Sequence, residues 1–295
     1  MADLVTSDGV RLAVEVAGPA RAPVTVVLVH GWTLDARTWG PVAAALAGEV
    51  RVVRYDHRGH GRSDAVRAEC MTLERLADDL AEVVAAAAPD GPLVLAGHSM
   101  GGMAVMALAE RHPGLLARRV AAVALVATAS GGLAAANLGL PPRRAELVRR
   151  LEKRVHASPR WLARERLGDP RLLGPALRWL LLGPRPTREA VRLTTLSVAS
   201  CRPATMAGFR PTLDAHERDA ALAAFAGIPT VVLAGGRDRL IPVSAARRIA
   251  RALPSANLTI LPDTGHMIPV ERPAAVAGRI AALVRAAAAG SPTAR

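Results

Sequence analysis

Residues Leu93–Gly101 read LVLAGHSMG, and this stretch decides the fold. Four apolar residues are followed by the pattern G-x-S-x-G around Ser99 and then by a helical pattern over Met100–Arg111. A strand that turns this sharply into a helix strains its serine, and the two glycines leave room for the chain to pack around it. The turn exposes the Ser99 hydroxyl at the N-terminus of the helix, where free N–H groups favour a negatively charged oxygen. The stretch therefore predicts a nucleophilic serine.

Similar short apolar runs recur along the chain, and helical patterns separate several of them. The runs rich in Val, Leu and Ile are 24–29, 50–55, 93–96, 120–126, 230–233 and 258–261. The predicted helices are 72–88, 100–111, 244–253 and 273–289. Continuous apolar runs are typical of strands buried on both faces, and their alternation with helices indicates a parallel sheet. We therefore expect an α/β fold with a mostly parallel central sheet, helices on both of its faces, and an opening hairpin at Asp8-Gly9.

One segment interrupts this alternation. The predicted strands at 120–126 and 230–233 are separated by roughly a hundred residues, far more than an ordinary crossover needs. We interpret residues 133–212 as an inserted helical lid, and residues 1–132 and 213–295 as the core. Cationic residues crowd part of the insertion: Arg143, Arg144, Arg149, Arg150, Lys153, Arg154, Arg160, Arg164 and Arg166. They form either a solvated face or a surface that attracts an anionic substrate.

Asp238 and His266 are the candidate partners of Ser99. Asp238 follows the predicted strand at 230–233, and His266 follows the one at 258–261. Because parallel strands end at one edge of the sheet, both side chains are expected beside the serine. A serine hydroxyl is a weak nucleophile unless a base held by an acid takes its proton, which His266 and Asp238 would supply. The alternatives are a turn or helix-capping role for Asp238 and a surface loop for His266.

Donors for a developing oxyanion are expected from the backbone N–H groups of Trp32 and Met100. Trp32 follows a predicted strand in the sequence His30-Gly31-Trp32, and Met100 directly follows the serine. His30 is interpreted as a structural residue of its loop rather than as an acid or base.

The composition of the 295 residues bounds the function classes. Hydrophobic residues make up 51% of the chain and charged residues 21%, which supports a sizeable core and excludes a disordered chain. The net charge of +13 could attract nucleic acid, anionic lipid or acidic substrates, but only 2% of the residues are aromatic and no nucleic-acid-binding motif accompanies the charge. We therefore expect no nucleic-acid partner and interpret the charge as a compositional habit.

Localisation and cofactors are predicted from missing motifs. The first residues hold no basic region followed by an apolar run, and the apolar run at 120–127 is too short to span a bilayer, so a soluble cytoplasmic protein is expected. Cys70 and Cys201 cannot form a disulfide framework. His57 and His60 stand on a glycine-rich loop without further ligands, and no phosphate-loop or dinucleotide motif is present, so neither a metal nor a cofactor is expected.

The sequence resembles the α/β-hydrolase fold superfamily, in its lid-bearing subgroup related to small esterases, cofactor-free perhydrolases and carbon–carbon bond hydrolases. The matching motifs are His30-Gly31-Trp32, Asp56-His57-Arg58-Gly59-His60-Gly61-Arg62-Ser63, Gly97-His98-Ser99-Met100-Gly101-Gly102, Asp238 and Gly265-His266. They cover the core but not the insertion. The resemblance implies that Asp56–Ser63 is a structural loop held by Arg58 and Asp64. Similar dehalogenases and epoxide hydrolases carry Asp at the elbow, and dienelactone hydrolases carry Cys, so Ser99 implies acyl chemistry.

The leading hypothesis is a serine hydrolase that cleaves a small acyl substrate (an ester, thioester or lactone) through an acyl-enzyme on Ser99. An acyltransferase or perhydrolase using the same three residues is an alternative, because an alcohol, an amine or hydrogen peroxide could replace water. A non-catalytic ligand-binding protein of the same fold is a third hypothesis. The identity of the substrate and the oligomeric state stay open.

Overall fold

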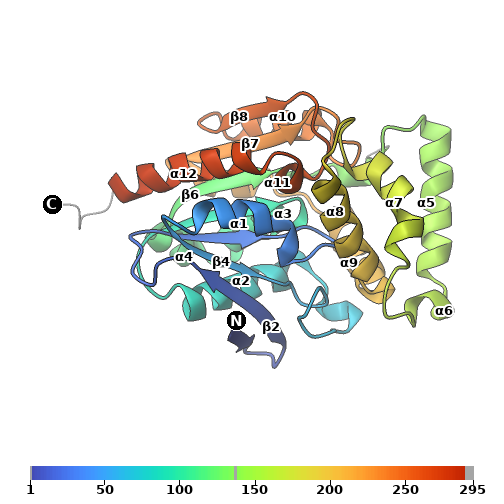
Figure 1. Ribbon diagram of the computed structural model, residues 1–295, viewed down its shortest axis with the longest axis horizontal. Coiled ribbons are helices and arrows are strands. Elements are labelled where there is room, and N and C mark those ends of the chain that lie inside the picture. Colours follow the sequence, from blue (N-terminus) through green and yellow to red (C-terminus); the bar gives the residue numbers. More distant parts are fainter. Residues whose placement is uncertain (1, 136–137, 290–295) are drawn as a thin grey trace.

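The chain is organised around a sheet of eight strands (Figure 1). The computed structural model describes residues 2–135 and 138–289. Across the sheet the strands are ordered β1-β2-β4-β3-β5-β6-β7-β8. Their bounds are β1 Ala2–Val5, β2 Arg11–Ala17, β3 Thr25–Val29, β4 Arg51–Tyr55, β5 Leu93–His98, β6 Val120–Val126, β7 Thr230–Gly235 and β8 Asn257–Leu261.

The sheet is mostly parallel, as predicted. β1 and β2 form the expected antiparallel hairpin, with Gly9 in its turn at a φ of 83°, and β2 also pairs antiparallel with β4. The remaining neighbours, from β4 to β8, all pair in parallel. β5 and β7 extend to His98 and Gly235, beyond their apolar runs, because the ladders with β6 and β8 continue that far.

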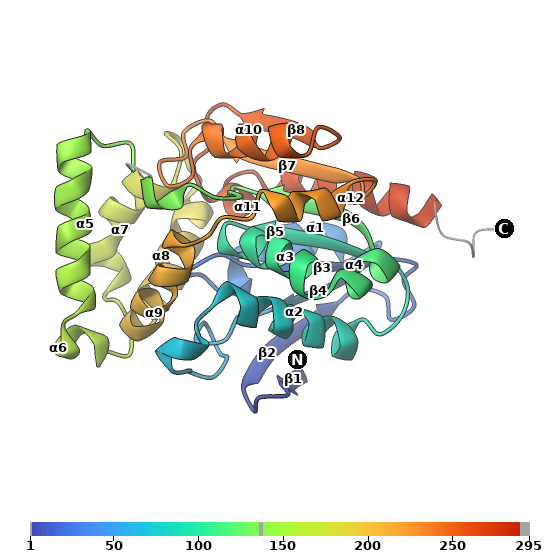
Figure 2. The ribbon, with the colours of Figure 1, turned by 180° about the vertical axis from the view of Figure 1, so that it is seen from behind.

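Helices cover both faces of the sheet (Figures 1 and 2). One face carries α1 (Gly40–Leu46) and α12 (Pro273–Ala289), and the other carries α2 (Leu73–Ala87), α3 (Met100–Arg111) and α10 (Val243–Ala252). In β5, Leu93 and Leu95 pack on the α2–α3 side while Val94 and Ala96 pack on the α1–α12 side. All four are fully buried, which explains why this strand is a continuous apolar run.

The described residues between β6 and β7 form five α-helices, and Figure 1 shows α5, α6 and α7 at the end of the molecule farthest from the end of α12. The five are α5 Pro142–His156, α6 Pro159–Leu162, α7 Pro170–Leu181, α8 Arg188–Ser200 and α9 Pro203–Asp214. The remaining short helices are α4 Pro113–Arg119, α11 Ile268–Glu271, and the 3-10 turns η1 Ala36–Trp39, η2 Ala68–Cys70, η3 Leu133–Ala135 and η4 Ala220–Phe225. The division of the chain into a core and a lid stays a prediction; α9 continues past residue 212 to Asp214.

The loop after β4 is held by charged side chains. Arg58 is 1% exposed and donates hydrogen bonds of 2.6 and 2.7 Å to Asp79 and of 2.9 Å to Asp8. The Asp64 carboxylate accepts the backbone N–H of Arg11 on β2 at 3.0 Å. A buried guanidinium requires such partners, so these contacts support the interpretation of the loop as structural.

The turn between β5 and α3 is strained and tightly packed. Ser99 has a φ of 53° and a ψ of −121°, a conformation that residues with a side chain rarely adopt. A Cβ on Gly97 would lie 2.5 Å from the backbone nitrogen of Gly102, and one on Gly101 would lie 2.2 Å from the carbonyl oxygen of Val29 on β3. The two glycines are therefore needed because backbone occupies the space of a side chain.

We expect Gly101→Ala to lower the free energy of unfolding by about 3 kcal/mol, because the added methyl group overlaps the backbone of β3. The matched control is Gly278→Ala on α12, where nothing lies within 4 Å of the added atom. That substitution should raise the free energy of unfolding by roughly 0.5–1 kcal/mol through helix propensity. Urea denaturation measures both, and equal effects of the two substitutions would contradict the steric explanation.

Candidate active site

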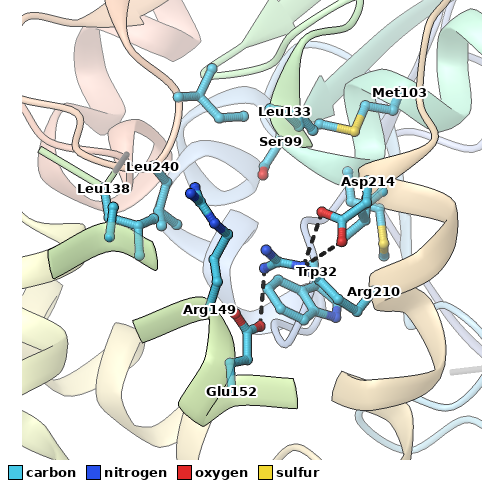
Figure 3. A pocket seen from close by; sticks show the side chains of 14 residues that line it. Trp32, Ser99, Met103, Leu133, Leu138, Arg149, Glu152, Arg210, Asp214 and Leu240 are labelled. Carbon is cyan, nitrogen blue, oxygen red and sulfur yellow. Dashed lines mark hydrogen bonds and ion pairs between the residues drawn. The ribbon is translucent and has the colours of Figure 1, made fainter. Parts of the chain in front are cut away.

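Ser99 stands at the carboxyl end of the sheet and faces a cavity. Its residue is 9% exposed, and it lines the cavity together with Trp32, Met100 and Met103. Figure 3 shows the Ser99 hydroxyl pointing into this space, around which lie Leu133 and Leu240 as well as charged side chains of α5 and α9. The hydroxyl is thus reachable from a partly open and largely apolar cavity.

Asp238 and His266 meet at the same edge of the sheet. Asp238 follows β7 and His266 follows β8, and their side chains are 0% and 4% exposed. The His266 Nδ1–H donates to Asp238 Oδ2 at 2.7 Å. The other carboxylate oxygen accepts the backbone N–H groups of Leu240 and Ile241, each at 2.9 Å. Asp238 therefore stabilises a turn and also fixes the ring of His266, with Nε2 left as the free nitrogen.

His98, which precedes Ser99, connects the turn that carries the serine with the loop that carries His266. His98 Nε2 donates to the backbone carbonyl of His266 at 2.9 Å, and the two imidazole rings lie 4.9 Å apart. Within residues 2–135 and 138–289, no hydrogen bond joins the Ser99 hydroxyl to the His266 ring. The three predicted residues are thus gathered at one edge, with the His266–Asp238 contact formed.

The predicted oxyanion donors lie beside the serine. A Cβ on Gly31 would lie 3.0 Å from Ser99 Cβ, so the loop after β3 passes directly against the elbow. The Trp32 indole N–H donates to the carbonyl of Met206 on α9 at 3.2 Å, which fixes that side chain. In the described part of the chain, neither the Trp32 nor the Met100 backbone N–H donates to another protein group. Both remain available to an oxygen bound at Ser99.

Three buried histidines support this loop. The ring of His30 donates from Nδ1 to the carbonyl of Gly31 at 2.8 Å and accepts the His57 backbone N–H at Nε2 at 2.9 Å. His60 Nε2 accepts the backbone N–H of Thr33 at 3.2 Å. Burial lowers the pKa of His30 to about 4 and that of His60 to about 3, and it also lowers the pKa of His57. The neutral rings of His30 and His60 accept backbone N–H groups, and the ring of His57 donates from Nε2 to the carbonyl of His30 at 3.0 Å, which agrees with a structural role for His30.

These pKa shifts make the fold sensitive to acid. An unfolded histidine titrates near pH 6.5, so as the pH falls below 6.5 the unfolded chain binds protons that the folded chain does not bind until about pH 3–4. The free energy of unfolding should therefore decrease with falling pH, with a slope of about 1.4 kcal/mol per pH unit for each such histidine. In His60→Gln the slope between pH 6 and pH 4 should be smaller by the contribution of one histidine, about 1.4 kcal/mol per pH unit. Denaturant titrations at each pH test this, and an unchanged slope would contradict it.

The sequence analysis missed the contacts that hold the loop of His266. Leu181, at the end of α7, accepts the His266 backbone N–H at 2.8 Å. Glu271, which is 5% exposed, accepts the N–H of Gly265 at 2.9 Å and that of Gly183 at 2.7 Å. The only signal in the sequence is an acidic residue five positions after His266, which says nothing about partners so far away along the chain. The loop is thus tied to the segment that follows α7.

We expect Glu271→Ala to lower the free energy of unfolding by about 3 kcal/mol, because two buried N–H groups lose their acceptor. Glu271→Gln should cost less, since its amide oxygen still accepts one of them. Asp263→Ala, in the same loop, serves as the control, because that carboxylate is 47% exposed and its ion pair with Arg185 spans 3.4 Å. The control should change stability by less than about 0.5 kcal/mol. Urea denaturation distinguishes these outcomes, and a neutral Glu271→Ala would refute the role of the carboxylate.

Residues 2–135 and 138–289 form neither a cluster of metal ligands nor a membrane-spanning helix. No group of three or more His, Cys, Asp or Glu side chains in those ranges could hold a metal ion. No helix there combines the length and apolar character required to cross a bilayer. Cys70 and Cys201 are both free thiols.

Comparisons with known proteins place this geometry in a family. The model of the alpha/beta hydrolase family matches residues 26–279. The acetyltransferase component of the acetoin cleaving system of Pseudomonas putida is 32% identical over 286 residues; the match covers 92% of this chain and only 65% of that protein's length. The pimeloyl-acyl-carrier-protein methyl ester esterase of Aromatoleum aromaticum is 29% identical over 251 residues, covering 82% and 90%. A thermophilic esterase from Thermogutta terrifontis superposes with a TM-score of 0.75 at 26% identity, covering 97% and 98%. The chain therefore belongs to the α/β hydrolase family and is an enzyme of that fold.

Proposed function

We propose that this enzyme is a serine hydrolase that cleaves a carboxylic ester, thioester or lactone through an acyl-enzyme on Ser99. The observation that carries the proposal is the 2.7 Å hydrogen bond between His266 and Asp238 at the sheet edge where the Ser99 hydroxyl faces the cavity. A base fixed by a buried carboxylate is what an alcohol needs to become a nucleophile. The same pair argues against a non-catalytic binding protein, which would need no oriented base.

In the first half-reaction the Ser99 Oγ attacks the carbonyl carbon, and its proton passes to Nε2 of His266. This transfer requires the two atoms to come within about 2.6–3.2 Å. Asp238 stabilises the imidazolium, and the N–H groups of Trp32 and Met100 donate to the carbonyl oxygen as it becomes negative. When the tetrahedral intermediate collapses, the carbon–oxygen or carbon–sulfur bond breaks, and His266 gives the proton to the leaving alcohol or thiol.

In the second half-reaction water takes the place that the leaving alcohol or thiol has vacated. His266 takes a proton from the water molecule, whose oxygen attacks the acyl carbon, and the proton then returns to Ser99 as the acid leaves. The esterase names of the relatives from Aromatoleum and Thermogutta favour water as the acceptor. The acetyltransferase name of the Pseudomonas relative keeps transfer to another acceptor as the second candidate. Product analysis with a competing alcohol separates the two.

The cavity supports a small acyl substrate as the proposed partner. Its wall near the serine is formed by side chains that are apolar: Met103, Leu133, Leu138, Leu240 and Ile241. Ala145 and Arg149 of α5 and Arg210 of α9 also line it, which supports our proposal that the insertion acts as a lid. An acyl chain would lie along the apolar wall, with its carbonyl group at Ser99.

We expect Ser99→Ala to lower kcat/KM on a p-nitrophenyl ester by about 10⁴-fold or more, because the acyl-enzyme cannot form. A fluorophosphonate probe should label the wild-type protein and leave Ser99→Ala unlabelled. The matched control is Ser200→Ala on α8, whose hydroxyl bonds only to the carbonyl of Leu196 in its own helix and whose loss should leave both readouts unchanged. Circular dichroism checks that both variants are folded. Turnover of folded Ser99→Ala near the wild-type rate would refute the proposal.

A further inference from the structure

The positive charge of the protein is concentrated in one segment. Residues 133–212 contain fifteen Arg and one Lys against five acidic residues, a net charge of +11. The other 215 residues carry twenty-two cations and twenty acids, a net charge of only +2. A compositional habit would spread the arginines over the whole chain, so the interpretation of the charge as such a habit does not account for this distribution.

Exposed apolar side chains are concentrated in the same segment. Seven large hydrophobic residues are exposed in the described part of the chain, and five of them lie on α5 and α7. The five, with their exposed fractions, are Leu147 58%, Leu151 50%, Val155 43%, Leu172 82% and Trp179 48%. Both ribbon views show α5 and α7 next to each other at one end of the molecule (Figures 1 and 2). Exposed apolar side chains that gather in this way mark an interaction site, and Leu147, Leu151 and Val155 form a row of them on α5.

α5 turns charged side chains toward the protein and an apolar row toward solvent, the reverse of an ordinary surface helix. Arg149 and Glu152 point inward, where they line the cavity that also contains Ser99, and Glu152 pairs with Arg210 of α9 at 3.0 Å (Figure 3). The row formed by Leu147, Leu151 and Val155 at intervals of four residues is left in solvent. A surface helix normally buries its apolar row, so this row has no partner within the described residues.

Arginines flank the apolar row. At helical spacing, Arg143, Arg144 and Arg154 share its side of α5. None of the three forms an ion pair with any residue in 2–135 or 138–289, whereas Arg150 pairs with Glu146 at 2.8 Å. Trp179 on α7 is stacked by Arg239, with 4.8 Å from the guanidinium carbon to the ring centroid, so aromatic and cationic groups also lie together there.

We propose that the exposed apolar residues of α5 and α7 with the flanking arginines, here called the docking face, bind the surface of an anionic lipid bilayer. An amphipathic helix with an apolar row between cations lies in the boundary between headgroups and acyl chains, where both kinds of side chain are accommodated. An acidic protein would pair with the arginines but would give no role to protruding leucines. A second copy of this chain would bring two segments of net charge +11 together, which repel.

The docking face lies directly outside the cavity, because α5 separates the two. Binding would therefore hold the Ser99 cavity against the lipid, where acyl substrates partition. The inference goes beyond the proposed function and does not depend on it, because lipid binding needs no reaction at Ser99. A failure of one can thus be distinguished from a failure of the other.

The test is flotation with vesicles of equal parts phosphatidylglycerol and phosphatidylcholine, compared with vesicles of phosphatidylcholine alone. Wild-type protein and Ser99→Ala should both float with the anionic vesicles. Their binding to the neutral vesicles should be at least about tenfold weaker. Salt at about 0.5 M should also weaken binding to the anionic vesicles, because it screens the charges. The double variants Leu147→Ser with Leu151→Ser, and Arg143→Gln with Arg154→Gln, should each weaken binding about tenfold or more.

Matched controls carry the same changes elsewhere. Val5→Ser with Val16→Ser removes the two exposed valines of β1 and β2, and Arg251→Gln with Arg285→Gln removes two exposed cations of α10 and α12. Both pairs should bind like wild type. Circular dichroism checks that every variant is folded.

Three results would overturn the proposal. The first is equal binding of wild-type protein to neutral and anionic vesicles. The second is unchanged binding of the folded leucine or arginine variants. The third is that the wild-type protein binds neither kind of vesicle. In that case, loss of self-association in the leucine variant would assign the face to a second copy of this chain. Loss of binding to an acidic acyl carrier protein in the arginine variant would assign it to an acidic protein.

Discussion

The strained turn at Ser99 is the constraint on which the site depends. A positive φ at a residue with a side chain costs on the order of 1–3 kcal/mol, so surrounding contacts must impose it. Here β5 and α3 are buried on both sides of the turn, and the backbone of β3 fills the space beside Gly101. The packing of the core therefore also directs the hydroxyl toward the cavity. The loop that carries Trp32 lies against the same turn, so it shares the constraint.

The base is held from a different direction. The strand ends position Asp238 and His266 roughly. The backbone N–H of His266 also bonds to Leu181 at the end of α7, and the Glu271 carboxylate accepts the N–H groups of Gly183 and Gly265. The segment between β6 and β7 thus lines the cavity and also holds the base, because the carbonyl of Leu181 accepts the His266 N–H.

Most of the fold could be predicted from the sequence because the signals are local. Apolar runs such as 120–126 give buried strands, and the G-x-S-x-G turn gives the strand–helix junction at Ser99. Asp238 and His266 could be named because each follows a strand whose end lies at a known edge. The roles of Glu271 and Leu181 could not, since their partners are 6 to 88 residues away and depend on how α7 docks. The sequence also gives no sign that the Ser99 hydroxyl and the His266 ring are not hydrogen bonded.

The orientation of α5 is the hardest feature to predict, and its cause is physical. Periodicity assigns the apolar row of a helix to the core, but α5 packs over a cavity rather than over a core, so its charged side chains have room inside. The fifteen arginines of residues 133–212 repel one another, which lowers the stability of this segment unless anions gather around them. A layer of anionic headgroups supplies those anions and also covers the exposed leucines. The features that are unfavourable for α5 in water are therefore those that favour it at a lipid surface.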